Sequence, residues 1–287
     1  MPEMPEVESL ARFLTEKCVG HAIARIDLAA FSALKTYDPP LMALHGLEIE
    51  SVTRRGKFID ISAQGLHLVF HLARAGWLRW KDVQPDAPAR PGKGPLALRL
   101  KLDDGSGFDL TEAGTQRKLA VYVVADPSSI PMVATLGPDP LADDFDQAAL
   151  AALLAAAGRS QLKGVLKDQR TIAGIGNAYS DEILHAARLS PFKPANSLDQ
   201  GELSVLYGAI KDELTGAIQR AEGLAAKDLK GEKKSGLRVH GRKGEPCDVC
   251  GDTIAEVSFA DSSLQYCPTC QTGGKKLADR RLSKLLK

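Results

Sequence analysis

The spacing of apolar and polar positions changes twice along the chain. Apolar side chains recur at helical spacing over residues 7–18, and Gly20 is placed to end that helix. Over residues 47–102 they alternate with polar side chains, which is the pattern of half-buried strands joined by hairpins. Helical spacing returns over residues 144–220. The pattern predicts an α+β fold with an N-terminal antiparallel β-sandwich flanked by helices and a C-terminal helical lobe.

Individual elements follow from the same pattern. Strands are expected over residues 58–61, 66–72 and 96–102. Helices are expected over residues 144–157, 162–167, 178–188 and 203–220. Gln64 and Gly65 are expected to form the turn between the first two strands, and Pro5 suits the first position of the N-terminal helix.

Proline- and glycine-rich stretches predict three domains. Residues 136–141 are typical of a linker, so we expect an N-terminal β-sandwich domain over residues 1–135 and a helical domain over residues 136–224. Residues 225–287 are expected to form a mobile basic connector, a small module at about 240–272 and a basic tail.

Composition indicates an ordinary soluble protein. The chain has 287 residues, of which 44% are hydrophobic and 25% charged. It contains neither an apolar run of membrane-spanning length nor the pattern of a signal peptide. We therefore expect a cytoplasmic monomer that does not bind membranes.

Charge is distributed unevenly along a chain whose net charge is only +1. Residues 227–287 contain 13 Lys and Arg against 8 Asp and Glu, whereas residues 1–226 contain 24 against 28. A basic module on a more neutral body fits a protein that binds nucleic acid, and a solvated basic tail explains the charge equally well.

Four cysteines form the strongest local motif. Cys247 and Cys250 are separated by two residues, as are Cys267 and Cys270, and sixteen residues lie between the pairs. This spacing is typical of a closed structural site with one Zn²⁺ ion, with a redox dithiol as the alternative. The fifth cysteine, Cys18, lies on the apolar face of the first helix and is expected to be a buried thiol.

The amino terminus carries groups that can do chemistry. Removal of Met1 would leave the secondary amine of Pro2 beside the carboxylate of Glu3, and an α-amino group is partly unprotonated near neutral pH. Glu3 and Glu6 lie at or before the positive end of a helix dipole. The alternative is an ordinary ragged terminus.

Two further motifs can be explained either by a function or by local structure alone. The basic cluster Arg54–Lys57 stands at a strand entrance, where a solvated turn is the plain interpretation. Gly174–Asn177 is expected to form a tight turn into a helix, where backbone could approach a phosphate.

The motifs together resemble the formamidopyrimidine-DNA glycosylase and endonuclease VIII family, of which this chain would be a divergent member. The resemblance covers nearly the whole chain and rests on five motifs in the family's order: Pro2–Glu8, Arg55–Lys57, Leu136–Pro138, Gly174–Asn177 and Gly244–Cys247. It implies a β-sandwich followed by a helix-two-turns-helix lobe and a four-cysteine zinc-finger β-hairpin.

The resemblance also implies an activity. The expected partner is double-stranded DNA with damaged bases or abasic sites, and the expected activity is that of a base-excision repair glycosylase with an abasic-site (β-elimination) lyase step. Pro2 would attack the sugar and form a Schiff base, Glu3 would act as acid and base, Glu6 would support the terminus, and Lys57 would donate near the sugar and phosphate.

Further residues are implied as DNA contacts, and some positions depart from the family's pattern. Asn177, Arg159 and Lys163 would contact backbone phosphate. Arg74 stands where the family has a methionine that fills the space of the flipped base. Arg117 keeps the family's arginine, and Leu119 replaces its phenylalanine.

Two departures concern the later chemistry and the lesion. Ser262 replaces a zinc-finger arginine, which argues against δ-elimination. The connector is also shorter than the family loop that covers 8-oxoguanine.

Two other functions remain open from the sequence. One is a divergent protein that binds damaged or branched DNA with little or no glycosylase activity, which the changed residues favour. The other is a zinc-ribbon protein of transcription or translation, which would explain the cysteines but not the first six residues.

Overall fold

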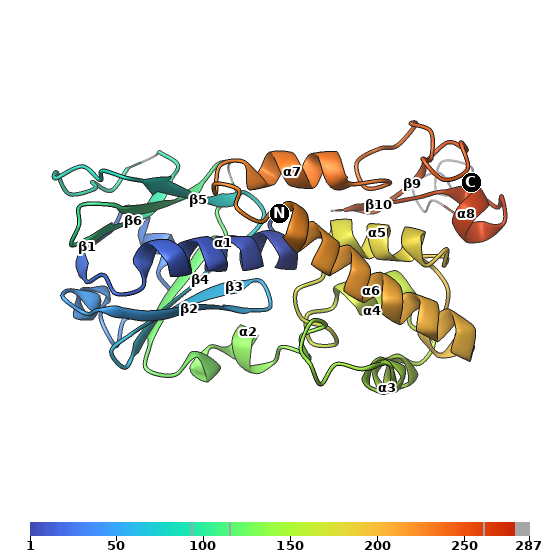
Figure 1. Ribbon diagram of the computed structural model, residues 1–287, viewed down its shortest axis with the longest axis horizontal. Coiled ribbons are helices and arrows are strands. Elements are labelled where there is room, and N and C mark those ends of the chain that lie inside the picture. Colours follow the sequence, from blue (N-terminus) through green and yellow to red (C-terminus); the bar gives the residue numbers. More distant parts are fainter. Residues whose placement is uncertain (93, 115, 261, 279–287) are drawn as a thin grey trace. The chain divides into compact units, whose positions relative to one another are not determined.

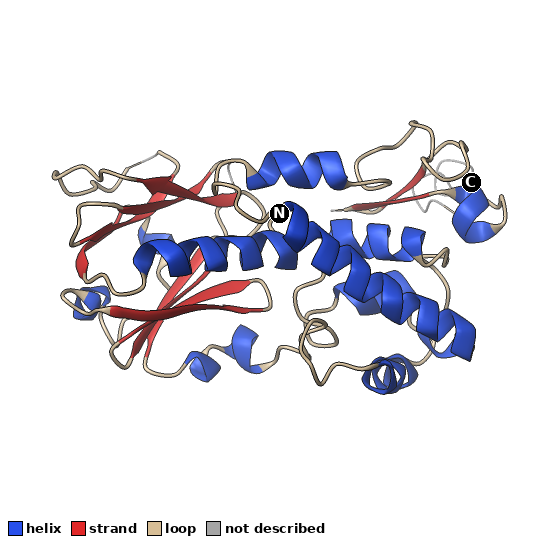
Figure 2. Ribbon diagram, in the orientation of Figure 1, coloured by secondary structure: helices blue, strands red, loops and turns tan. Residues whose placement is uncertain are grey.

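The computed structural model describes residues 1–278 apart from positions 93, 115 and 261. These residues form two compact units (Figure 1). Unit 1 consists of Met1–Thr135 and Arg220–Glu232, and unit 2 consists of Leu136–Gln219 and the described residues from Lys233 onward. Figure 2 shows that the strands gather in the sheets of unit 1 and in one hairpin of unit 2.

Two four-stranded antiparallel sheets form the body of unit 1. One has the strand order β1-β6-β7-β5 and the other β2-β3-β4-β8. The strands are β1 (Ile23–Leu28), β2 (Ile49–Arg55), β3 (Phe58–Ala63), β4 (Leu66–His71), β5 (Gly76–Lys81), β6 (Leu96–Leu102), β7 (Gly107–Glu112) and β8 (Ala120–Val124). Buried apolar side chains from both sheets join one core, which confirms the predicted sandwich.

Helix α1 (Met4–Cys18) covers part of this core with its apolar face. Val7, Leu10 and Leu14 are buried, and Cys18 is fully buried, as expected for a structural thiol. The helix starts at Met4, so Pro5 occupies its second position rather than its first. Unit 1 also contains the short helices η1 (Phe31–Ala33), η2 (Leu41–Leu44), η3 (Pro127–Ser129) and α2 (Pro131–Ala134).

The hairpin of β3 and β4 places two polar residues at one end of the sheet. Its turn is formed by Gln64 and Gly65, both of which have positive φ angles, as the sequence indicated. The antiparallel register pairs Phe58 with His71. Lys57, which precedes Phe58, is therefore brought to the end of the hairpin where His71 lies.

Unit 2 is mainly helical and ends in a small hairpin. Its helices are α3 (Gln147–Ala157), α4 (Leu162–Lys167), α5 (Asn177–Ala186), η4 (Ala195–Ser197), α6 (Gln200–Arg220) and α8 (Pro268–Thr272), and the hairpin consists of β9 (Ala255–Ser258) and β10 (Ser263–Tyr266). The helix predicted over residues 144–157 begins only at Gln147, because the Asp146 side chain accepts a hydrogen bond from the Ala149 amide and caps it.

The prediction of a mobile connector over residues 225–240 was wrong. Helix α7 (Leu229–Gly236) forms within it. Leu229 is only 1% exposed and joins the core of unit 1, and the Lys230 ammonium lies 4.4 Å from the centre of the Trp77 ring. Burial of one leucine and one cation–π contact order a segment whose composition is that of a loop.

Among the described residues, no helix is both long enough and apolar enough to span a membrane.

Candidate active site and metal centre

The first residues of the chain are held by the start of α1. The Glu3 amide donates to Glu6 Oε2 at 2.7 Å, while the Glu3 side chain accepts from the Glu6 amide, which makes a reciprocal capping box. Glu3 is 2% exposed and Glu6 is 4% exposed. Pro2 is also buried, whereas Met1 is 48% exposed. Two carboxylates are thus fixed beside Pro2 at the positive end of a helix.

Lys57 lies on a tight turn between β2 and β3. Gly56 turns the chain with a φ angle of 57°, and Lys57 behind it is only 7% exposed. The pKa of His71 is lowered to about 4, mainly by burial of the ring and secondly by the positive charge of the Lys57 ammonium. An unprotonated His71 beside Lys57 was not foreseen, because only the hairpin register brings the two together.

His71 is oriented by its neighbours. Its ring lies 4.8 Å from that of Phe58, centre to centre, and its Nδ1 accepts a hydrogen bond from the Ala73 amide at 3.2 Å. This contact requires a neutral ring with its hydrogen on Nε2. His71 therefore stays an uncharged, fixed neighbour of Lys57 at neutral pH.

An ion pair fastens α1 to the turn that carries Lys57. Arg54 Nε lies 2.9 Å from Glu8 Oε2, and a second Arg54 nitrogen donates to the Gly56 carbonyl at 3.2 Å. Burial opposes the charge of Glu8, but Arg12 and Arg54 together lower its pKa. The basic cluster is thus largely engaged with protein groups, and Arg54 fixes the first helix relative to Lys57.

The candidate DNA contacts of unit 1 occupy different environments. Arg74 is exposed on the loop between β4 and β5, directly after Ala73, which has a φ angle of 52°. Arg117 is exposed on the loop between β7 and β8, where it donates to the Gly94 carbonyl at 2.9 Å. Both guanidinium groups are therefore on the surface.

Leu119 does not share this exposure. Its side chain is 2% exposed and belongs to the core of unit 1, and its amide donates to the buried Glu112 carboxylate at 3.0 and 3.1 Å. Although Leu119 stands where the family has a phenylalanine, it is a core residue in this chain. Entry of its side chain into a base stack would require the core to open.

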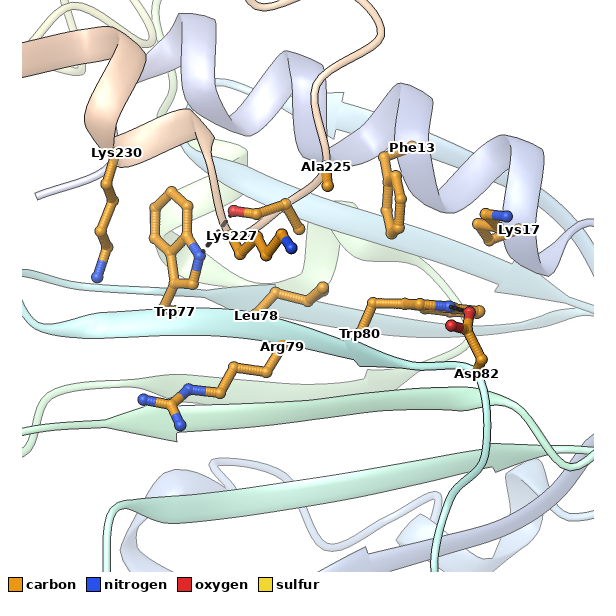
Figure 3. A pocket seen from close by; sticks show the side chains of 11 residues that line it. Phe13, Lys17, Trp77, Leu78, Arg79, Trp80, Asp82, Ala225, Lys227 and Lys230 are labelled. Carbon is orange, nitrogen blue, oxygen red and sulfur yellow. Dashed lines mark hydrogen bonds between the residues drawn. The ribbon is translucent and has the colours of Figure 1, made fainter. Parts of the chain in front are cut away.

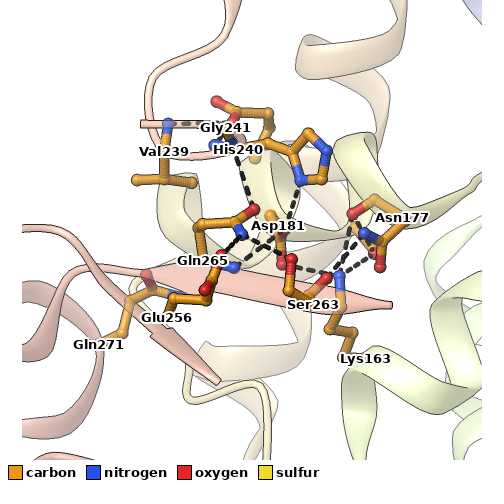
Figure 4. A network of polar contacts seen from close by, with 12 residues as sticks. Lys163, Asn177, Asp181, Val239, His240, Gly241, Glu256, Ser263, Gln265 and Gln271 are labelled. Carbon is orange, nitrogen blue, oxygen red and sulfur yellow. Dashed lines mark hydrogen bonds and ion pairs between the residues drawn. The ribbon is translucent and has the colours of Figure 1, made fainter. Parts of the chain in front are cut away.

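The turn before α5 contains two glycines and is held by the side chain of Gln169. Gly174 has a φ angle of 89°, and its amide donates to the Gln169 side chain, which in turn donates to the Ile175 carbonyl. Asn177 is the first residue of α5, and its Nδ2 donates to the Ser263 carbonyl of β10 at 2.8 Å (Figure 4). The turn is thereby tied to the hairpin.

Lys163 lies beneath this turn rather than on its surface. The side chain is 6% exposed, and its ammonium donates to the Asn177 carbonyl at 2.9 Å, to Ser180 Oγ at 2.8 Å and to Asp181 Oδ1 at 2.7 Å. This burial argues against the expected direct phosphate contact and favours a role in holding the turn. Arg159, by contrast, is exposed just after α3.

Asp181 joins α5 to the segment before the hairpin. Its second oxygen accepts from His240 Nδ1 at 2.7 Å and from the Gln265 amide at 3.2 Å, and its carboxylate is fully buried (Figure 4). Gln265 also accepts from the Gly241 amide and donates to Glu256. The sequence did not single out these residues, because the network links positions far apart in the chain.

The four predicted cysteines converge on one point of unit 2. Their sulfur atoms all lie within 4.8 Å of one another. His185 Nε2 lies 3.3 Å from the sulfur of Cys247, where its N–H can donate to a thiolate. Four thiol ligands on two short turns fit one tetrahedral Zn²⁺ ion, and the four cysteines leave it no position for a substrate. The centre is therefore structural. Ser262 lies at the tip of the β9–β10 hairpin, at the end of the strands away from the cysteines, and its carbonyl accepts from the Phe259 amide.

Three family models match the chain in succession. They are the formamidopyrimidine-DNA glycosylase N-terminal domain over residues 1–119, the formamidopyrimidine-DNA glycosylase H2TH domain over residues 136–228, and the zinc finger found in FPG and IleRS over residues 244–273. An N-terminal β-sandwich with a helix packed on its core, a helical DNA-binding domain and a zinc finger together define the class of helix-two-turns-helix DNA repair proteins. The chain belongs to the formamidopyrimidine-DNA glycosylase family.

Relatives support this assignment over most of the chain. The formamidopyrimidine-DNA glycosylase of Symbiobacterium thermophilum is 35% identical over 294 residues, which cover 98% of this chain and 93% of that protein. An uncharacterized formamidopyrimidine-DNA glycosylase-like protein of Mycobacterium tuberculosis is 58% identical over 157 residues, which cover 55% of this chain and 98% of that protein.

Solved structures of related proteins are similar to this chain over nearly its whole length. The Lactococcus lactis enzyme bound to DNA containing an AP site superposes with a TM-score of 0.81 at 27% identity, over 94% of this chain and 99% of that chain. The MutM (FPG) protein of Thermus thermophilus gives 0.80 at 30% identity, over 96% and 100%.

Proposed function

We propose that this protein is a base-excision repair enzyme that removes damaged bases from DNA and cleaves the resulting abasic site through Pro2. The observation that carries the proposal is the N-terminal capping box, which fixes two buried carboxylates beside a buried proline. The related proteins are formamidopyrimidine-DNA glycosylases, and one of them was solved on DNA containing an AP site.

The first half of the reaction uses Pro2 and Glu3. Once Met1 is removed, the amine of Pro2 attacks C1′ of the damaged nucleotide, and the base leaves with the electron pair of the glycosidic bond and takes up the proton that the Pro2 nitrogen loses. Glu3 gives its proton to the sugar ring oxygen as the ring opens, so that a Schiff base remains on Pro2. Glu6 holds the Glu3 backbone in place, and Lys57 stabilises negative charge on the sugar and its phosphate.

The second half is a β-elimination. The Schiff base acidifies the C2′ proton, which passes to a base, and the electron pair moves to expel the 3′ phosphate. Water then hydrolyses the Schiff base, which frees Pro2 and releases the unsaturated aldehyde at the strand end. The Ser262 position offers no guanidinium for a second elimination, so we propose that the lyase reaction stops here.

DNA backbone contacts come from both units in this proposal. In unit 1 they are Arg74 and Arg117, which are exposed. In unit 2 they are Arg159 and the N-terminus of α5 at Asn177, where the helix dipole favours phosphate. Lys163 and Asp181 act through the turn that they hold, and are therefore positioning residues.

The decisive experiment is covalent trapping. Full-length protein, with removal of Met1 verified by intact mass, is incubated with abasic-site duplex and borohydride, which reduces the Schiff base to a stable adduct. We expect Pro2→Gly and an N-terminal extension each to abolish the adduct. Undiminished trapping in both variants would refute Pro2 as the nucleophile.

Glu3 can be tested with a matched control on the same helix. Glu3→Gln keeps an oxygen for the capping box and is expected to lower base release roughly 10²–10⁴-fold. Glu16 is exposed further along α1, so Glu16→Gln should leave base release unchanged. Equal rates in the two variants would remove Glu3 from the mechanism.

A second candidate is a binder of damaged DNA that does not cut it. The buried Leu119 favours this function, because the side chain that would fill the space of a flipped base is not on the surface. The same duplex panel distinguishes the two functions: tight binding without base release or trapping would support the binder and contradict the enzyme.

A further inference from the structure

A cavity of about 770 Å³ lies in unit 1 (Figure 3). It is lined by the second half of α1, by β5 and by residues 225–230. Phe13 is the first α1 residue in its wall, and the rise of a helix puts it roughly 14 Å along the axis from Met4. The cavity is therefore separate from the site of Pro2 and Glu3.

Aromatic rings form its apolar wall, and hydrogen bonds hold them in place. Trp77 Nε1 donates to the Ala226 carbonyl and Trp80 Nε1 donates to Asp82, both at 3.0 Å. The Phe13 and Trp80 rings meet edge to face with 5.6 Å between centres. Fixed aromatic faces of this kind are suited to stacking against a planar ring.

The remaining wall is strongly basic. It includes Lys17, Arg79, Lys227 and Lys230, whereas Asp82 is the one acidic side chain that lines the cavity. Within the described part of the chain, none of these four cations forms an ion pair with a carboxylate. Figure 3 shows Lys227 reaching into the space between Trp77 and Phe13.

The four cations are exposed at the rim of the cavity, and among the described residues no carboxylate pairs with them. Lys230 lies over the Trp77 ring, and burial, followed by the nearby Arg79, lowers its pKa. Like charges gathered beside apolar rings repel one another and lose hydration, so an anion placed among them is favoured. The cavity volume is in the range of small-molecule sites.

We propose that this cavity binds a nucleotide, with its base stacked on the partly exposed Trp80 ring and its phosphate held by Lys227 and Lys230. The same chemistry is offered by a free nucleotide and by an unpaired nucleotide at a DNA strand end. The site is independent of the Pro2 reaction, so its ligand acts away from Pro2 and Glu3.

The chain contains two tryptophans, and both line the cavity, so intrinsic tryptophan fluorescence reports on this site alone. Full-length protein is titrated with deoxyadenosine monophosphate, deoxyadenosine, inorganic phosphate and a short single-stranded oligonucleotide. We expect saturable quenching by the monophosphate, about tenfold weaker binding of the nucleoside, and no quenching by phosphate. Quenching by the oligonucleotide alone would also support the site and assign it to strand ends.

Charge variants complete the test. Lys227→Glu and Lys230→Glu should each weaken nucleotide binding about tenfold or more. Lys35 is exposed elsewhere in unit 1, so Lys35→Glu makes the same charge change outside the cavity and should have no effect. No saturable quenching, or equal affinities in all three variants, would overturn the proposal. Because fluorescence needs no catalysis, the outcome does not depend on whether the enzyme cleaves DNA.

Discussion

His71 is held in its uncharged form by burial and by Lys57, and this couples the stability of unit 1 to pH. The pKa of His71 is about 4 in the folded protein and 6.5 in a model peptide. Between these two pH values the unfolded chain therefore binds a proton at His71 and the folded chain does not. Stability is therefore complete above about pH 6.5 and falls as the pH drops toward 4. Because the ring is partly exposed, we expect a loss of about 1–3 kcal/mol.

His71→Gln tests this coupling. Glutamine keeps an acceptor for the Ala73 amide and does not titrate, so the variant should lose less stability than the wild type between about pH 6.5 and 4. The measurement is the urea midpoint across this range. Equal losses in both proteins would show that other groups dominate the acid sensitivity.

Leu119 and Arg74 were both expected from the sequence at positions where the family fills the space of a flipped base, yet they differ in burial. Leu119→Ala should cost about 2–5 kcal/mol of stability without any DNA present, because it opens a cavity in the core. Arg74→Ala is on the surface and should cost less than about 1 kcal/mol. Chemical denaturation of the two variants checks this, and a stable Leu119→Ala protein would contradict a core role.

At the scale of elements, α7 and the β9–β10 hairpin form by different means. Helix α7 is ordered by the burial of Leu229 and by the contact of Lys230 with Trp77. The hairpin has two strands of four residues each, too few to build a core of their own. The free energy of zinc binding must therefore supply much of its folding.

Removal of zinc should unfold the hairpin selectively. We expect one zinc per chain, and we expect chelation or Cys267→Ser to expose residues 244–273 to protease and to weaken DNA binding. Unit 1 should keep its structure because all four cysteines of the zinc centre lie in unit 2. Cys18→Ala is the matched control: Cys18 is buried in unit 1, and burial raises its pKa to about 12, so this variant should retain its zinc. Full zinc content in Cys267→Ser would contradict the assignment.

At the scale of the whole molecule, local charge matters more than the net charge of +1. If Arg74, Arg117 and Arg159 each contact a phosphate, affinity for abasic duplex should fall roughly 40-fold between about 50 and 200 mM salt. Arg159→Ala should reduce the slope of log affinity against log salt by about 0.9, and Lys35→Ala should leave it unchanged. Filter binding or anisotropy at several salt concentrations measures both slopes, and a salt-independent affinity would exclude phosphate contacts by these arginines.

Patterns local to the sequence were sufficient for several features. Alternating leucines predicted β6, and helical spacing predicted the α1 face, because each depends on the period of its own element. The cysteine spacing predicted the zinc centre, because four thiolates on two short turns can meet without help from the rest of the fold. The capping box at Glu3 and Glu6 was not predicted, although it is equally local, since its two partners are three residues apart.

Tertiary structure decided the rest. The pairing of Lys57 with His71 depends on strand register, and the burial of Lys163 on Asp181 depends on how α4 packs against α5. Leu119 matched a family position in sequence, but only the core around it determined that it faces inward. The sequence by itself therefore determined the zinc ligands and offered Pro2 as the candidate nucleophile. Which side chains reach the surface was decided by packing, because burial depends on residues that lie far away in the chain.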